Sequence, residues 1–222
     1  MKKPSFKGVA EAFTLVELLV VAAILAILAA LFVPALDNKP GRATIPHCMS
    51  NLKQIGYAIR MFSWDNNGQF PLQVSITNGG SLELMGSNSP ALHFQSLSNY
   101  LARNWRVFWC PADESKQPLT NNSVLSDCDV RYFLSVDATR KITDAFHAGD
   151  RNLEVAGQPV KPGLFALTTN AAVRWAREMH SKRVGTRCGN ILFTDNHVEY
   201  LRASLSAAVQ RQGLATNRLA FP

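Results

Sequence analysis

The most marked hydrophobic pattern lies near the N-terminus. Phe13 to Leu36 form an apolar run of 24 residues in which Glu17 is the only charged side chain. A helix rises about 1.5 Å per residue, so a run of this length could cross the roughly 30 Å hydrocarbon layer of a bilayer. Three lysines precede the run, and this asymmetry predicts that the N-terminus begins in the cytoplasm. The pattern predicts a membrane-inserting helix over residues 13–36.

The pattern changes after this run. Residues 37–46 contain Pro40, Gly41 and Pro46, which predict a break in the chain. Beyond the break, apolar residues recur at intervals of three and four, as expected for one face of a helix: Cys48, Leu52, Ile55, Ile59 and Phe62. The turn residues of 65–68 should end this helix. We expect the apolar stripe to pack on a sheet.

The remaining chain, residues 67–222, shows shorter patterns. Apolar spacing predicts helices over 91–103, 170–181 and 203–213, and strands over 106–110 and 129–135. Residues 190–201 read as a hairpin with its turn at Asp195-Asn196, because Asx residues tolerate the positive φ of such turns. These elements predict the α+β class, with a long N-terminal hydrophobic helix packed on a small antiparallel β-sheet head.

Four cysteines lie beyond the apolar run, at positions 48, 110, 128 and 188, and none belongs to a CxxC pair. A zinc ribbon is therefore not expected. If this part of the chain is exported, two disulfides with three connectivities become available, whereas buried free thiols are the alternative. Our first choice for a disulfide is Cys110 with Cys128, since a short loop could close between them.

Composition and charge add little to a catalytic interpretation. The net charge is +7, and no Walker loop, GxSxG, HExxH or GxGxxG motif occurs. A basic cluster spans residues 174–187 and contains Arg174, Arg177, Lys182, Arg183 and Arg187, with only Glu178 opposing. We interpret it as a solvated surface rather than a nucleic-acid site, and we expect no nucleic-acid partner.

Ligand-type side chains also occur together near the C-terminus. His180, Cys188, Asp195 and His197 lie within one stretch, but their intervals match no standard metal-site spacing. The aspartates of the chain select no carboxylate pair for acid–base chemistry. We therefore expect no metal, no cofactor and no enzymatic activity.

Three interpretations of the N-terminal region compete. An ordinary signal peptide could be cleaved after Val33-Pro34-Ala35, and a plain single-pass anchor would keep the run intact. Neither gives Glu17 a role, although a charge in the middle of an inserted helix costs about 2.5–3.5 kcal/mol on insertion scales. In the third interpretation, cleavage before the apolar run leaves the helix attached to the mature protein and places a new cationic amine near Glu17.

Residues 12–21, Ala-Phe-Thr-Leu-Val-Glu-Leu-Leu-Val-Val, carry a close resemblance that favours the third interpretation. They resemble the processing motif of type IV pilins and type II secretion pseudopilins. The resemblance implies that a prepilin peptidase cuts the Ala12–Phe13 bond and methylates the new amine of Phe13, although the family usually has Gly where this chain has Ala12. It also implies an assembly role for Glu17, by pairing with a neighbour's Phe13 amine, and a helix kink at Pro34.

Parts of the remaining chain resemble a subset of pseudopilin-like proteins with a divergent head. The matching segments are residues 48–71, the Cys-Pro-x-Asp element of 110–113 and residues 149–153. The hairpin of 190–201, together with His180, partly matches the C-terminal motif of the prepilin-processing-associated domain. Its spacer is longer than usual, and Asn196 replaces the Gly of that motif.

The resulting hypothesis is a structural subunit of a type II secretion-like pseudopilus or type IV pilus-like filament. It divides the chain into a leader (1–12), a transmembrane assembly helix (13–36), a linker with the periplasmic part of the spine helix (37–66) and a globular periplasmic head (67–222). The implied partners are other pilin subunits, the prepilin peptidase, the inner-membrane assembly machinery and the inner membrane itself. The alternative is a membrane-anchored periplasmic binding protein or enzyme that carries a prepilin-type leader.

Overall fold

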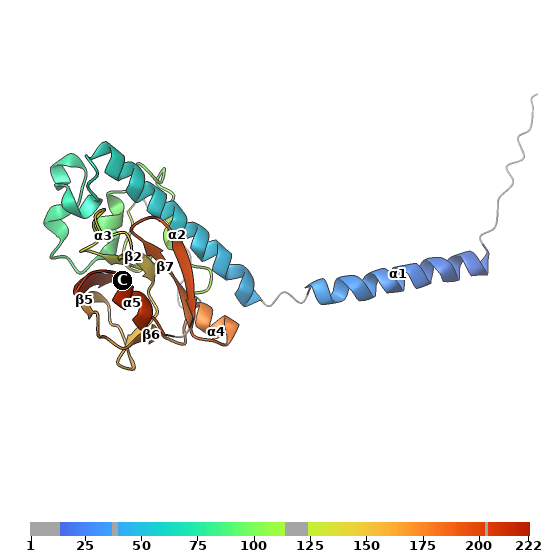
Figure 1. Cartoon of the computed structure of the whole chain (residues 1–222). Coiled ribbons are helices and arrows are strands. Elements are labelled where there is room, and N and C mark those ends of the chain that lie inside the picture. Colours follow the sequence, from blue (N-terminus) through green and yellow to red (C-terminus); the bar gives the residue numbers. More distant parts are fainter. Residues whose placement is uncertain (1–13, 37–39, 114–123, 203) are drawn as a thin grey trace, which may run out of the picture. The chain divides into compact units, whose positions relative to one another are not determined.

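The computed structural model describes residues 14–36, 40–113, 124–202 and 204–222. These residues belong to two units, Met1–Asn38 and Lys39–Pro222 (Figure 1). The first unit contains one helix, α1 (Leu15–Leu36). In the four described ranges, no helix is both long and apolar enough to cross a membrane. The long hydrophobic helix predicted for the N-terminus is therefore not found among the described residues.

Helix α2 (Pro40–Asp65) opens the second unit. The break predicted over residues 37–46 is wrong for residues 40–46, because α2 already begins at Pro40 and continues through Pro46, and residues 37–39 lie outside the described ranges. Proline is well tolerated at the first helical position, where its missing N–H has no intrahelical role. The C-terminal end agrees with the sequence prediction: the helix stops at Asp65, and Asn67 and Gly68 adopt positive φ.

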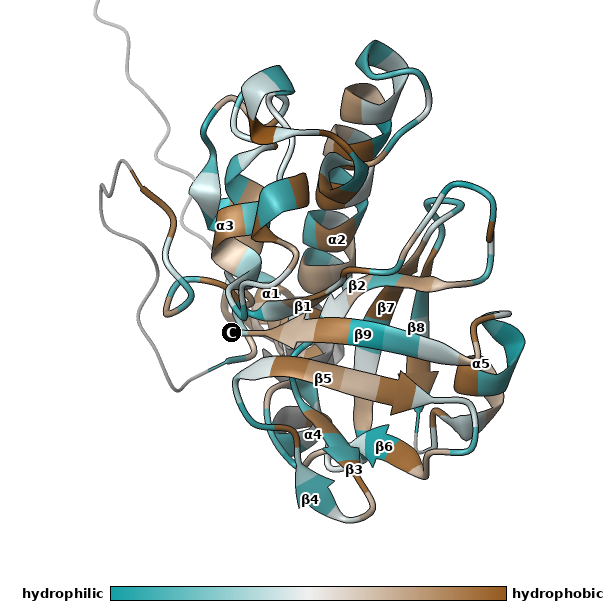
Figure 2. Cartoon of the chain, turned by 90° about the vertical axis from the view of Figure 1, so that its left-hand side faces the viewer, coloured by the Kyte–Doolittle hydropathy of each residue, from teal (hydrophilic) through white to brown (hydrophobic). Residues whose placement is uncertain are grey.

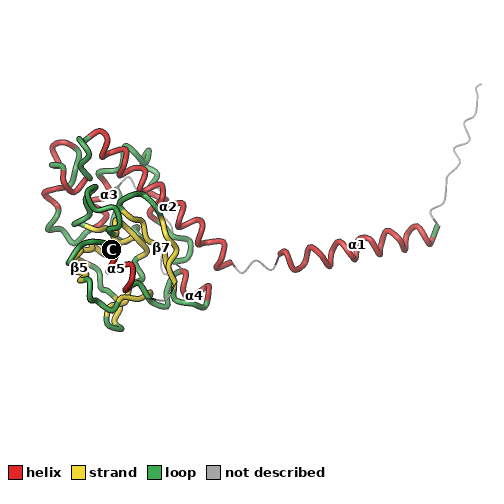
Figure 3. The backbone as a smooth tube through the Cα atoms, viewed as in Figure 1, coloured by secondary structure: helices red, strands yellow, loops and turns green. Residues whose placement is uncertain are grey.

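An antiparallel sheet forms the centre of the second unit (Figure 3). Its strand order is β5-β9-β1-β2-β7-β8, and the bounds are β1 (Tyr132–Ser135), β2 (Phe146–Asp150), β5 (Gly163–Thr168), β7 (Cys188–Phe193), β8 (Val198–Arg202) and β9 (Thr216–Phe221). All five strand pairs are antiparallel. The α+β class and the antiparallel sheet are thus confirmed, and the predicted hairpin of 190–201 is the β7–β8 pair.

A smaller sheet lies beside the larger one and was not expected. Its strands are β3 (Leu153–Val155), β4 (Gln158–Pro159) and β6 (Val173–Trp175), in the order β4-β3-β6. The helix predicted over 170–181 is wrong: this stretch contains β6 and then the start of α4 (His180–Val184). Val173 and Trp175 are buried while Arg174 is exposed, so the true pattern is strand alternation. The predicted helix near the C-terminus is α5 (Ser206–Arg211), but β9 follows it.

Strand alternation divides the buried apolar residues into two cores. Leu134 and Leu192 face α2 and pack in one cluster with its residues Leu52, Ile55 and Ile59. The neighbouring residues of the same strands, such as Phe133 and Ile191, enter the second cluster with Trp175. Figure 2 shows hydrophobic residues along both α2 and the strands. The apolar stripe of α2 therefore packs on the sheet, as its spacing predicted.

Gly56 permits the close contact between α2 and the β7–β8 hairpin. A Cβ atom at this position would lie 2.9 Å from Leu192 Cδ1 and would overlap the side-chain oxygen of Asn196 in the hairpin turn. Asn196 itself adopts a φ of 78°. The hairpin turn and the helix are thus fitted to each other, and the helix needs a residue without a side chain at this point.

The segment between α2 and β1 contains short helices: η1 (Pro71–Gln73), η2 (Ile76–Asn78), η3 (Leu82–Leu84), α3 (Pro90–Gln95) and η4 (Trp105–Phe108). The helix predicted over 91–103 is shorter than expected, since α3 ends at Gln95 and positive φ angles follow at Ala102 and Arg103. The strand predicted over 106–110 is wrong. Trp105, Val107 and Phe108 are all buried in the single turn of η4, so the run is not a strand with one apolar face.

Candidate functional site

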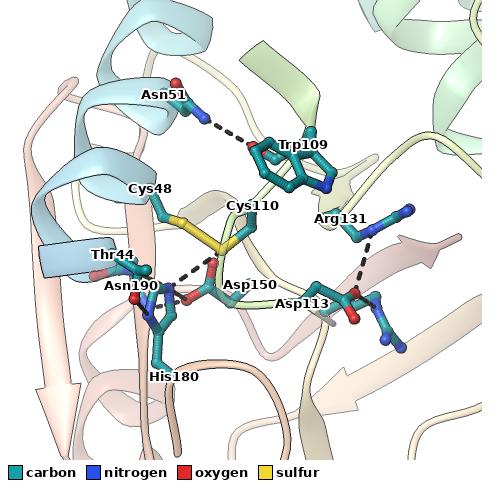
Figure 4. The surroundings of a disulfide bond; sticks show 11 residues. Thr44, Cys48, Asn51, Trp109, Cys110, Asp113, Arg131, Asp150, His180 and Asn190 are labelled. Carbon is teal, nitrogen blue, oxygen red and sulfur yellow. Dashed lines mark hydrogen bonds and ion pairs between the residues drawn. A yellow bond between two sulfur atoms is a disulfide. The ribbon is translucent and has the colours of Figure 1, made fainter. Parts of the chain in front are cut away.

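A disulfide between Cys48 and Cys110 joins α2 to the loop that follows η4, with 5.5 Å between the Cα atoms (Figure 4). Both cysteines are fully buried. The pairing of Cys110 with Cys128 is wrong: Cys128 is free and exposed, and Cys188 is free and buried. The side-chain amide of Asn51, one turn after Cys48, donates to the carbonyl of Trp109 at 2.8 Å. This bond joins the loop to α2 next to the disulfide.

His180, the first residue of α4, is fully buried against this disulfide. Its Nε2 atom lies 3.4 Å from Cys110 Sγ, 3.5 Å from an oxygen of Asp150 and 3.2 Å from the side-chain amide of Asn190. Its Nδ1 atom lies 3.5 Å from the hydroxyl oxygen of Thr44 in α2. Figure 4 shows these side chains gathered around the two sulfur atoms.

Asp150 ends strand β2 and is fully buried. Its Oδ2 atom accepts hydrogen bonds from the backbone N–H of Asn190 at 2.7 Å and from the Asn190 side chain at 3.0 Å. Burial raises the pKa of Asp150 to about 7, although the bonds from Asn190 favour the ionised form. Within the described part of the chain, Asp150 Oδ1 and Asn190 Oδ1 have no hydrogen-bond partner.

A buried ion-pair cluster holds the other end of the Cys110–Asp113 loop. Asp113 Oδ2 lies 3.2 Å from Nε of Arg131, which is fully buried, and 2.8 Å from Nε of Arg151. Arg131 also donates to the carbonyls of Cys128 and Val130. Burial lowers the pKa of Arg131, and the Asp113 carboxylate opposes that effect. The Cys-Pro-x-Asp element therefore joins the loop to α2 through Cys110, and to Arg131 and Arg151 beside strands β1 and β2 through Asp113.

The four ligand-type residues considered from the sequence do not gather at one point. His180 lies at the disulfide, whereas Asp195 and His197 contact each other at 2.6 Å in the exposed β7–β8 turn. The backbone N–H of Cys188 bonds to Ser181. Sequence reasoning missed Asp150, Asn190 and Thr44 as neighbours of His180. Only the resemblance of residues 149–153 to pseudopilin-like proteins pointed toward Asp150.

The basic cluster has a counter-charge that the sequence interpretation did not include. Glu154 of β3 pairs with Arg174 at 2.7 Å and with Arg187 at 2.8 Å. Both arginines line an open pocket of about 610 Å³ next to β6, together with small residues that include Gly157 and Ser204. Arg177 and Lys182 line a second pocket, beside the Asp113 ion pairs. The interpretation that Glu178 alone opposes the cluster is wrong.

The N-terminal site residues fall partly outside the described ranges. Ala12 and Phe13, the predicted cleavage and methylation positions, lie outside them. Glu17 lies in the first turn of α1, where Oε2 accepts hydrogen bonds from the backbone N–H of Thr14 at 2.8 Å and from its hydroxyl at 2.7 Å. Helix α1 continues two residues beyond Pro34 to Leu36, so the predicted kink at Pro34 stays a prediction.

Comparison with known proteins gives one partial relationship. A stretch of 54 residues is 43% identical to the type II secretion system core protein G of Pseudomonas aeruginosa, and it covers 24% of this chain and 38% of that protein. No family model matches the chain. No solved structure matches it either. The partial identity supports a pseudopilin-like relationship for part of this chain.

Proposed function

We propose that this chain is a structural subunit of a type II secretion-like pseudopilus or type IV pilus-like filament. The observation that carries the proposal is the 43% identity over 54 residues to a type II secretion core protein. The processing-like motif of residues 12–21 supports the same conclusion from the sequence. In this role the chain is an assembly component rather than an enzyme, and its partners are other pilin-like subunits and the machinery that assembles them.

The proposed life cycle begins in the inner membrane. The apolar run of 13–36 inserts there, a prepilin peptidase cuts the Ala12–Phe13 bond, and the Phe13 amine is methylated. The second unit then folds in the periplasm. Its disulfide supports this location, because disulfides persist in oxidising compartments and are rare in the cytosol. Mass spectrometry of the native N-terminus tests the processing step: we expect methylated Phe13, and a start at Leu36 would instead indicate an ordinary signal peptide.

Glu17 is the residue that the filament hypothesis uses most directly. In an assembled filament its carboxylate would pair with the Phe13 amine of a neighbouring subunit. Leaving one charge of such a buried pair without its partner costs about 3–5 kcal/mol. The structure offers a competing local role, because Glu17 already accepts two hydrogen bonds from Thr14 at the start of its own helix.

Two variants separate these roles in cells. Glu17→Ala removes the carboxylate, whereas Thr14→Ala removes only the hydroxyl that bonds to it and keeps the charge. We expect Glu17→Ala to abolish recovery of sheared filaments and Thr14→Ala to retain most of it, with both proteins in the membrane fraction. Equal losses from the two variants would assign Glu17 to capping its own helix, and normal filaments with Glu17→Ala would refute its assembly role.

The anchored binding protein or enzyme is the competing hypothesis. It would use a pocket in the second unit, and the open pocket beside β6 is one candidate. Two of its lining arginines already share Glu154 as a counter-ion. A deletion strain distinguishes the two hypotheses: loss of secretion or of filaments supports a structural subunit, whereas normal secretion favours the competing hypothesis.

A further inference from the structure

The surroundings of the disulfide contain four side chains of metal-ligand type from four parts of the fold. Cys48 belongs to α2, Cys110 follows η4, Asp150 ends β2 and His180 begins α4. All four are fully buried. One ligand atom from each of Cys48, Cys110 and His180 lies within 4.8 Å of the other two. Asp150 Oδ2 lies 3.5 Å from the same imidazole.

The two separations measured from His180 Nε2 suit a tetrahedral ion. Zinc lies about 2.3 Å from thiolate sulfur and about 2.0 Å from imidazole nitrogen or carboxylate oxygen, so neighbouring ligand atoms in a tetrahedron are roughly 3.3–3.8 Å apart. His180 Nε2 is 3.4 Å from Cys110 Sγ and 3.5 Å from Asp150 Oδ2. In Figure 4 the imidazole and the carboxylate both point toward the sulfur atoms. Two sulfurs, one imidazole and one carboxylate form a donor set typical of zinc.

A second observation points to a cation at the same place. Asp150 Oδ1 and Asn190 Oδ1 are buried acceptor atoms without a hydrogen-bond partner among the described residues. An unsatisfied buried acceptor is costly, and proteins normally provide it with a donor, a water molecule or an ion. Both atoms belong to residues whose other polar atom lies within 3.5 Å of His180 Nε2, so the unsatisfied acceptors are on residues that border the cluster.

The surrounding residues also resemble the outer shell of a metal site. Thr44 lies 3.5 Å from His180 Nδ1, on the other side of the ring from Nε2, which faces Cys110 Sγ at 3.4 Å and the Asn190 amide at 3.2 Å. Asn190 donates twice to Asp150 and fixes its carboxylate. Outer-shell contacts of this kind orient ligands and tune metal affinity in known metal sites.

We propose that Cys48, Cys110, His180 and Asp150 form a zinc site when the Cys48–Cys110 disulfide is open. The disulfide and the metal exclude each other, because the same two sulfurs serve both states. A dithiol reductant supplies two electrons and two protons, the S–S bond breaks, and the reductant becomes a disulfide. The two thiols then bind Zn²⁺ as thiolates and release their two protons to solvent. The proposal does not depend on the filament function.

The test uses the purified full chain in two redox states. One sample keeps its disulfide, and the other is reduced, freed of reductant under anaerobic conditions and incubated with zinc chloride. After unbound metal is removed, elemental analysis should find one zinc per reduced chain and none in the oxidised chain. Cobalt(II) in place of zinc should give the absorption of a tetrahedral thiolate site. A reduced, folded chain that takes up no zinc would overturn the proposal.

Variants identify the ligands. Cys110→Ser should abolish zinc uptake by the reduced chain, and His180→Gln and Asp150→Asn should each weaken it by at least about tenfold. Cys188→Ser is the matched control, because Cys188 is a buried free cysteine that the proposed ligand set does not include, and it should bind zinc like the unaltered chain. Unchanged affinity in His180→Gln would overturn the assignment. If reduction abolishes the circular dichroism signal of the folded chain, added zinc must restore that signal. Failure to restore it would also count against the site.

Discussion

His147 provides the sharpest test of how the second unit depends on pH. It lies in β2, buried against Phe70, whose ring centroid is 4.6 Å from that of the imidazole. Its Nε2 atom has no hydrogen-bond partner in the described ranges. Burial lowers the pKa of His147 to about 4 from its ordinary value of 6.5. The folded protein therefore holds this histidine neutral at pH values where the unfolded chain protonates it.

The sign and size of the effect follow from proton linkage. Below pH 6.5 His147 is protonated in the unfolded state, whereas in the folded state it stays neutral until about pH 4. The free energy of unfolding therefore falls as the pH falls through this interval. Each pH unit between the two pKa values is worth about 1.4 kcal/mol. The full penalty from this single histidine is about 3 kcal/mol, and most of it is present by pH 4.5.

The measurement compares urea unfolding of the unaltered protein and His147→Gln from pH 7.5 to pH 4.5. Because other groups also titrate, the informative quantity is the difference between the two proteins. We expect His147→Gln to lose about 2–3 kcal/mol less stability than the unaltered protein on acidification. His47→Gln, at an exposed histidine on α2, should keep the original pH dependence. Parallel pH profiles for the unaltered protein and His147→Gln would refute the argument.

Three further variants test other features by urea unfolding. Replacing both Cys48 and Cys110 by alanine should cost about 4 kcal/mol with a chelator present, because the disulfide closes a loop with a sequence separation of 62; a loss below 1 kcal/mol would contradict this. Gly56→Ala should destabilise by about 1–3 kcal/mol, since the added Cβ would overlap the β7–β8 hairpin turn, whereas unchanged stability would show that α2 can shift. Asp113→Asn should cost about 3–5 kcal/mol by leaving the buried Arg131 without its nearest carboxylate, and retained stability would mean that the backbone carbonyls suffice.

Local sequence patterns correctly predicted those elements whose buried face can be read from nearby residues. The apolar stripe from Leu52 to Phe62 identified the face of α2 that packs on the sheet, and Asp195-Asn196 identified the hairpin turn. The same reasoning failed at 170–181. There the spacing of apolar residues fits a helix, but pairing of β6 with β3 determines the outcome. Sequence spacing cannot include a strand partner that lies about 20 residues earlier in the chain.

The site depends even more on distant contacts. Cys48 and Cys110 are far apart in sequence, and His180 lies 70 residues beyond Cys110. Nearness in the sequence grouped His180 with Asp195 and His197, whereas the fold buries it against the disulfide and Thr44 of α2. A cysteine pattern does not determine disulfide connectivity. The loop containing Cys110 is held by Asn51 and Asp113, whose partners are distant in the sequence.

The position of β9 has a consequence for how the second unit is made. This strand consists of Thr216–Phe221, yet it lies between β5 and β1, inside the six-stranded sheet. A ribosome delivers the chain from its N-terminus, so β1 and β5 are synthesised with their shared neighbour still missing. Until β9 arrives, both strands present unpaired edges that invite aggregation or proteolysis. The six-stranded sheet can therefore form fully only when β9 has been synthesised. A product that stops short of Thr216 lacks an interior strand and is exposed to degradation, however well its earlier segments have folded.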